Sequence, residues 1–178
     1  MLLPGIGDYA SAFADHSFVE MLRDEHYGID VVAVNAHFKY YEARNLVEQL
    51  HQHIVLPALV QGYRRIHFAG VSLGGFGVLL YQREHPELVA SAILLAPYLG
   101  EEVDYAEFQR WRVQTQSGDA PPPLDAKNIW PWLTMLSADQ LATMYLAYGE
   151  QDKFSVDNST LGQLLPSGNV LTMQGKHN

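Results

Sequence analysis

Short apolar runs alternate with segments of helical spacing along most of the chain. Six runs have the length and β-branched or apolar character of buried strands: residues 2–4, 29–36, 65–71, 88–95, 144–148 and 169–174. Between them, apolar residues recur every three or four positions, as in residues 46–54 and 73–84. This alternation is typical of a parallel sheet with crossover helices. We therefore predict a single α/β domain over residues 1–178, with a mostly parallel sheet of about six strands and helices on both faces.

The alternation breaks between residues 98 and 137. This segment carries charge, three consecutive prolines (Pro121–Pro123) and the motif Trp130-Pro131-Trp132. A long segment of this kind inside a compact domain is often functional. We predict a lid-like insertion over residues 98–137, and the alternative is a surface loop with a helix of its own.

Composition and charge narrow the possible partners. The chain has 178 residues, a net charge of -9 and no basic run, which argues against nucleic acid as a ligand. Cysteine is absent, so disulfides, thiolate metal sites and cysteine nucleophiles are excluded. The first residues lack the pattern of a signal peptide, and the apolar runs are too short to span a bilayer. We expect a cytoplasmic protein that does not bind membranes.

The strongest local motif is Gly70-Val71-Ser72-Leu73-Gly74-Gly75, which matches Gly-x-Ser-x-Gly. It follows a predicted strand and opens a predicted helix. A serine at such a tight turn is held above the sheet, and the residues two positions away must be small. The start of the helix also supplies free N–H groups beside it. The alternative is a glycine-rich turn with an incidental serine, whereas the glycine patterns of phosphate-binding loops are absent.

The order of this motif and four others resembles the α/β-hydrolase family. The stretch Gly70–Gly75 resembles the family's nucleophile elbow. Leu3-Pro4-Gly5-Ile6-Gly7 resembles the family's oxyanion loop, and residues 85–97 resemble the segment of its sixth strand. Tyr148-Gly149-Glu150-Gln151-Asp152 resembles the turn that carries the acid, and Gly175-Lys176-His177 resembles the loop that carries the base. The resemblance covers nearly the whole chain and implies the fold of that family.

The resemblance implies a catalytic triad with Ser72 as nucleophile, Asp152 as acid and His177 as base. Each of the three follows the end of a predicted parallel strand, where sites form in open parallel sheets. The chain order of serine, aspartate and histidine is also that of the family. The alternatives that remain open are Glu150 or Asp157 as the acid and His37 as the base.

The resemblance also assigns the oxyanion hole. Its first donor is the backbone N–H of Leu73, the residue after the nucleophile. The second is that of Ile6, with Gly7 as the alternative because Pro4 replaces the family's usual histidine. Expected pocket residues are His37, Tyr40, Tyr98, Trp130 and Trp132. The aromatic residues of the insertion could equally form a small satellite core.

These features together predict a serine hydrolase that cleaves a small carboxylic ester or thioester through an acyl-enzyme, an esterase in the first instance. No metal site is expected, because His51 and His53 lie on opposite sides of a helix and no His-Glu-x-x-His motif occurs. No organic cofactor is expected either. The alternatives are a non-catalytic protein that binds a small ligand on the same fold, or a triad-dependent acyltransferase or lyase. The sequence does not indicate an oligomeric state.

Overall fold

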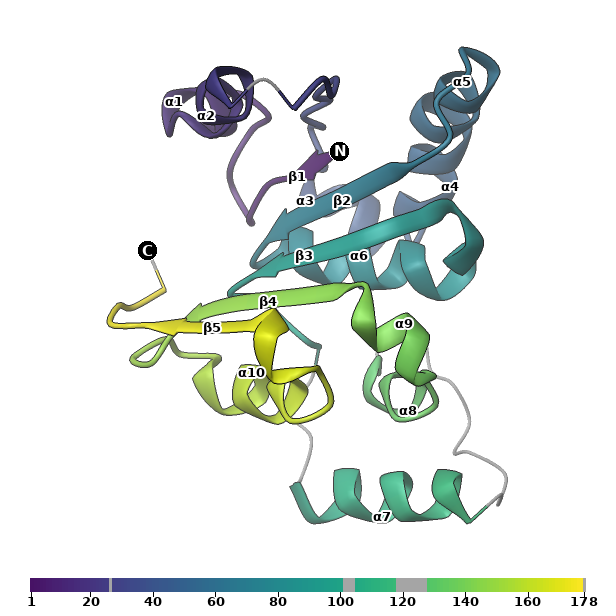
Figure 1. The fold of residues 1–178 in the computed structure, drawn as a ribbon, viewed down its shortest axis with the longest axis vertical. Helices are drawn as coiled ribbons and strands as arrows, with labels where there is room; N and C mark the ends of the chain where they lie inside the picture. The colour runs from purple at the N-terminus through teal and green to yellow at the C-terminus, as the bar shows by residue number, and fades with distance from the viewer. Residues whose placement is uncertain (26, 101–104, 118–127, 178) are drawn as a thin grey trace.

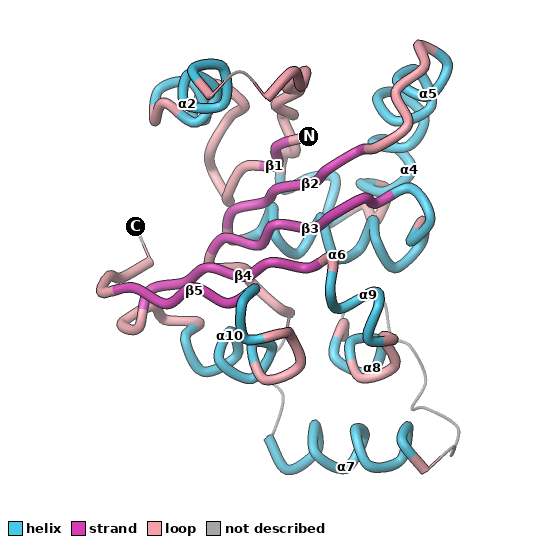
Figure 2. Tube along the Cα trace, in the orientation of Figure 1, coloured by secondary structure: helices cyan, strands magenta, loops and turns pink. Residues whose placement is uncertain are grey.

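A five-stranded parallel sheet forms the centre of the molecule (Figures 1 and 2). The computed structural model describes residues 1–25, 27–100, 105–117 and 128–177. Its strands lie side by side in chain order: β1 (Leu2–Leu3), β2 (Ile66–Val71), β3 (Val89–Leu95), β4 (Met144–Gly149) and β5 (Val170–Met173). All neighbouring pairs are parallel. The predicted α/β fold with a parallel sheet is confirmed.

The predicted strand at residues 29–36 is not formed. Its segment runs beside β1 in an extended conformation, but only Ala33 pairs with Leu2, as an isolated parallel bridge. The N–H of Leu2 donates to the carbonyl of Val32 at 2.8 Å, and the N–H of Val34 donates back to Leu2 at 3.0 Å. A ladder cannot continue here because β1 has only two residues. The sheet therefore has five strands, and the prediction of about six is wrong by this one.

Helices cover one face of the sheet. The helices before the insertion are α1 (Ala12–Asp15), α2 (Phe18–Asp24), α3 (Phe38–Glu42), α4 (Leu46–Leu50), the π-helix η1 (His51–Val55), α5 (Leu56–Val60), α6 (Leu73–Glu84) and η2 (Pro86–Leu88). After β4 come α10 (Ser155–Gly162) and η3 (Ser167–Asn169). Alternate strand residues such as Phe68, Leu94 and Leu146 are buried beneath this layer, as the period of two in a strand requires. The longest described helices of this layer and the strands thus share one core.

The opposite face of the sheet is partly exposed. Ile93, Tyr145 and Leu171 point away from the covered face and keep 37%, 44% and 58% of their surface. The helices α1 and α2 lie to the side of β1 (Figure 1). Within the described residues, helices therefore cover this face of the sheet less completely than the opposite face. None of the helices in those residues is long and apolar enough to cross a membrane.

A proline shapes the helix that precedes β2. Pro57 lacks an N–H and cannot continue the usual hydrogen-bond ladder. The chain forms the π-helical turn η1 directly before it, and α5 then starts with Pro57 in its first turn. The helix is thus interrupted by η1 and restarts at Leu56, with Pro57 in a position where its missing N–H costs no hydrogen bond.

The insertion contributes packing to the core. It contains α7 (Tyr105–Gln116) and α8 (Trp130–Leu133), and α9 (Ala138–Ala142) follows. Phe108 of α7 contacts Trp130 in a T-shaped pair, with ring centroids 5.3 Å apart. Trp130 and Trp132 are both buried in the core cluster. This is the satellite-core role left open by the sequence. Residues 101–104 and 118–127, which include the three prolines, lie outside the described residues, and a lid over the site stays a prediction.

The close packing between β1 and α6 leaves no space for a side chain at Gly74. A Cβ atom added to Gly74 would lie 2.2 Å from the carbonyl oxygen of Leu3, which is backbone and cannot move aside cheaply. We expect Gly74→Ala to lower the free energy of unfolding by about 1–3 kcal/mol, as overpacking does. Chemical denaturation measures this. Gly168→Ala is the control, because a Cβ there would meet nothing within 4 Å. Equal stability of the two variants would contradict this packing.

Candidate active site

Ser72 occupies a strained turn between β2 and α6. Its backbone has φ 51° and ψ -115°, a conformation that non-glycine residues rarely adopt. The N–H of Ser72 donates to the carbonyl of Leu95 at 2.9 Å, which fixes the turn against β3. A Cβ on Gly70 would lie 2.3 Å from the carbonyl oxygen of Gly74. The two glycines of the motif are thus needed for close backbone approach, as the sequence predicts.

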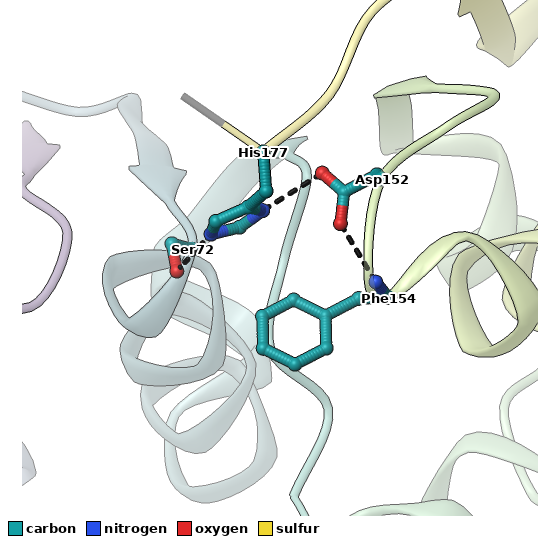
Figure 3. Close-up of polar contacts among 4 residues, drawn as sticks. All are labelled: Ser72, Asp152, Phe154 and His177. Atoms are coloured by element: carbon teal, nitrogen blue, oxygen red, sulfur yellow. Dashed lines mark hydrogen bonds and ion pairs between the residues drawn. The ribbon is translucent and has the colours of Figure 1, made fainter.

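Three side chains from separate strand ends meet at this turn (Figure 3). The Nε2 atom of His177 lies 2.9 Å from Ser72 Oγ, and its Nδ1 atom lies 2.7 Å from Asp152 Oδ2. Ser72 follows β2, Asp152 follows β4 and His177 follows β5. With the proton of the neutral imidazole on Nδ1, the ring donates to Asp152 and accepts from the serine hydroxyl. This geometry allows His177 to remove the hydroxyl proton from Ser72.

Asp152 is buried, and each of its carboxylate oxygens has a hydrogen-bond partner. Only 4% of its surface is exposed. His177 bonds to Oδ2, and the backbone N–H of Phe154 donates to Oδ1 at 2.7 Å. The rival carboxylate of Glu150 is instead exposed and accepts from the Gln174 side chain. Of the sequence candidates for the acid, Asp152 is the one bonded to His177 in the described residues.

The loop that carries His177 lies directly on the turn after β4. The N–H of Gln151 donates to the carbonyl of Gly175 at 3.0 Å. A Cβ on Gly149 would lie only 2.4 Å from that same carbonyl oxygen, so the close approach requires glycine. This role of Gly149 was not predicted from the sequence. The signal was the glycine that opens the stretch Gly149-Glu150-Gln151-Asp152.

The candidate oxyanion donors lie on both sides of Ser72. Leu73 is the first residue of α6, so its N–H has no carbonyl one turn earlier to bond. On the other side, a Cβ on Gly5 would lie 3.7 Å from Ser72 Cβ, which places this loop next to the serine. Ile6 follows it, with a side chain 61% exposed, and Gly7 adopts φ 85°. Within the described residues, no hydrogen bond uses the N–H of Ile6 or Leu73.

A cleft of about 710 Å³ lies beside the same loop. Gly7, Tyr9, His37 and Tyr40 line it, together with neighbouring charged residues. The ring of His37 stacks on Tyr40 at 6.4 Å and meets Tyr9 edge-on at 5.5 Å. His37 and Tyr40 therefore line a cleft, and His37 is bonded to neither Ser72 nor Asp152 by any contact between the described residues.

Tyr98 lies next to Ser72. The N–H of Tyr98 donates to the carbonyl of Ser72 at 3.0 Å. Its ring contacts Phe76 and Phe154, with centroids 5.7 and 5.5 Å away. Phe154 was not predicted as a site residue, although its place two positions after the candidate acid is a signal in the sequence.

The buried hydroxyl of Tyr41 has no hydrogen-bond partner among the described residues. Its hydroxyl oxygen lies 2.6 Å from where a Cβ of Gly77 would stand, in the second turn of α6. Burial raises the pKa of the Tyr41 phenol, so this group stays neutral at physiological pH.

In the described ranges, no group of three histidine, aspartate or glutamate side chains could hold a metal ion.

Solved structures of several hydrolases share this fold. A ferulic acid esterase aligns with a TM-score of 0.60 and 17% identity, over 99% of this chain and 76% of its own. The S-formylglutathione hydrolase of Staphylococcus aureus gives 0.58 and 15%, over 100% and 73%. A carboxylesterase structure from Nitrososphaera gargenis gives 0.57 and 13%, over 99% and 81%. At these identities the similarity establishes the fold alone, which is that of the α/β-hydrolases.

Sequence comparison assigns the family. No curated protein matches the chain in sequence. A family profile, however, matches residues 16–161, which include the elbow, the insertion and the acid turn. The chain therefore belongs to the esterase family described as "Putative esterase", built on the α/β-hydrolase fold.

Proposed function

We propose that the protein hydrolyses a small carboxylic ester or thioester through an acyl-enzyme on Ser72. The observation that carries this proposal is the continuous pair of hydrogen bonds from Ser72 Oγ through His177 to the buried Asp152. Membership of the esterase family supports it independently. The strained turn at Ser72 adds support, since strained backbone is often retained at functional sites.

In the first half of the reaction, Ser72 Oγ attacks the carbonyl carbon of the ester. His177 Nε2 takes the hydroxyl proton as the new C–O bond forms. The carbonyl oxygen becomes negative and accepts from the N–H of Leu73 and from that of Ile6 or Gly7. Collapse of this intermediate breaks the bond to the leaving group, which departs as an alcohol or thiol with the proton from His177.

In the second half, water cleaves the acyl-enzyme. His177 takes a proton from the water molecule while the water oxygen attacks the acyl carbon. The bond to Ser72 Oγ then breaks, the proton returns to Ser72, and the carboxylic acid is released. Asp152 holds the imidazole with its proton on Nδ1 in both halves and stabilises the imidazolium that forms in each. The N–H groups of Leu73 and of the oxyanion loop lie beside Ser72, where the negative oxygen forms.

The cleft beside the oxyanion loop is the proposed binding site for one arm of the substrate. Tyr9, His37 and Tyr40 present ring surfaces there, which favour an apolar or planar group. Tyr98 lies on the other side of the elbow and is proposed to contact the second arm. Trp130 and Trp132 are left out of this proposal because their side chains are buried in the core.

Turnover of p-nitrophenyl acetate and butyrate, and of a matching thioester, tests the proposal. We expect release of p-nitrophenol with a burst, because acylation by an ester with so good a leaving group is faster than hydrolysis of the acyl-enzyme. The competing alternatives give different results. A non-catalytic ligand-binding protein releases no p-nitrophenol, and a lyase turns over its own substrate without a burst. Either result from folded protein would overturn the proposal.

A further inference from the structure

We propose that Phe154 is a positioning residue for His177, and this inference rests on the proposed function. The backbone N–H of Phe154 donates to Asp152 Oδ1 at 2.7 Å. Its ring meets the His177 imidazole in a T-shaped contact, with centroids 4.9 Å apart and planes at 82°. A single residue thus touches both partners of the Asp152–His177 pair (Figure 3). It fixes the carboxylate with its backbone and the imidazole with its side chain.

The base depends on such contacts because its own loop is weakly held. The nearest backbone anchor in the described residues is the Gln151 N–H to Gly175 bond, two residues before His177. The His177 side chain remains 19% exposed. Its two hydrogen bonds restrict where the ring nitrogens lie, but the ring can still tilt about the line that joins them. The edge-on contact with Phe154 opposes that tilt, since T-shaped packing is lost as the planes rotate.

Phe154 can serve this purpose because it is itself held from several sides. Lys153 Nζ lies 4.8 Å from the centre of the Phe154 ring. Tyr98 packs against the ring at 5.5 Å, and Phe76 of α6 packs against Tyr98 at 5.7 Å. Phe76, Tyr98 and Phe154 therefore form a row of rings from the helix that follows Ser72 to the imidazole of His177. The row ties the position of the base to the element that carries the nucleophile.

Substitution of Phe154 tests the proposal through kcat rather than through substrate binding. For Phe154→Leu we expect kcat to fall about 10- to 100-fold, with KM nearly unchanged, because a misplaced base slows the chemical step. Phe154→Tyr keeps the ring and is expected to restore most of kcat. Phe13→Leu is the matched control: Phe13 forms a T-shaped pair with Phe18 at 5.7 Å, and no ring contact joins it to His177 among the described residues. It is expected to leave kcat unchanged.

A second measurement needs no substrate and separates this inference from the proposed function. The Nδ1 proton shared with Asp152 gives a low-field proton resonance when the imidazole is held in place. We expect this signal in the wild type and in Phe154→Tyr, and its loss or broadening in Phe154→Leu at unchanged melting temperature. An unchanged signal in Phe154→Leu overturns the positioning role, whatever the activity. So does a kcat loss that Phe154→Tyr fails to restore. Absence of ester turnover with the signal still dependent on the ring overturns only the proposed function.

Discussion

Ser72→Ala is expected to lower kcat for p-nitrophenyl esters by about 10⁵- to 10⁶-fold, the loss seen when a serine nucleophile is removed. The hydroxyl oxygen of Ser72 forms the covalent bond to the acyl group. Within the described residues, this hydroxyl is the group hydrogen-bonded to His177 Nε2. Alanine keeps the Cβ atom, so the strained turn and the fold are retained. Steady-state kinetics at equal concentrations of folded protein measure the effect.

The control for this variant is another serine–histidine pair of the same chain. Ser91 Oγ lies 2.7 Å from His67 Nδ1, but the pair is on the exposed side of the sheet. It has the same hydrogen bond without a strained turn or a buried carboxylate. Ser91→Ala is therefore expected to leave kcat unchanged. If Ser72→Ala kept more than about one hundredth of wild-type kcat, Ser72 would not be the nucleophile.

The second-largest effect is expected for Asp152→Asn, with kcat about 10⁴-fold lower. An amide at this position has the same shape but presents an N–H or a neutral oxygen to His177 Nδ1. The first choice places the imidazole proton on Nε2, facing Ser72, and both choices remove the charge that stabilises the imidazolium. The pH-independent kcat of the two proteins gives the ratio.

Glu150→Gln tests whether this loss is specific to the carboxylate bonded to His177. Glu150 lies two residues earlier in the same turn, and its partner is the Gln174 side chain. Glutamine can still accept that bond, so activity near the wild-type value is expected. A large loss in Glu150→Gln together with a small loss in Asp152→Asn would assign the acid to Glu150 instead.

The elements that sequence reasoning located best are those whose signal is both local and strongly periodic. The predicted helix at residues 73–84 is α6 over Leu73–Glu84, and five of the six predicted strands have close counterparts in β1 to β5. The glycine motif identified Ser72 because a tight turn between a strand and a helix requires small residues at Gly70 and Gly74. The packing of Gly74 against the Leu3 backbone is the nonlocal part of that reason.

Prediction failed where tertiary contacts override local pattern. Residues 29–36 are rich in β-branched residues, but strand formation there depends on the length of β1, which no local pattern contains. Ser17 and Glu20 have the spacing of a capping box. Ser17 instead adopts φ 62° with no side-chain cap, and its N–H donates to the carbonyl of Ala14 in the turn that follows α1. A true capping box forms at Ser137 and Gln140.

The site was predictable in its polar residues and not in its apolar ones. Ser72, Asp152 and His177 were identified by motif and chain order, and the structure brings them within hydrogen-bond distance. Aromatic residues carry no such signature, because a tryptophan in a loop can line a pocket or fill a core. Trp130 and Trp132 fill the core, whereas Phe154, which belongs to no motif, contacts His177.

The central claim is that Ser72 forms a covalent acyl-enzyme, and labelling with a fluorophosphonate tests it most directly. The reagent reacts with an activated serine, and peptide mass spectrometry locates the adduct. We expect one adduct per chain, on Ser72, absent from Ser72→Ala and formed far more slowly in His177→Ala. Folded wild-type protein that stays unlabelled, or that carries the adduct on a different serine, would contradict the account.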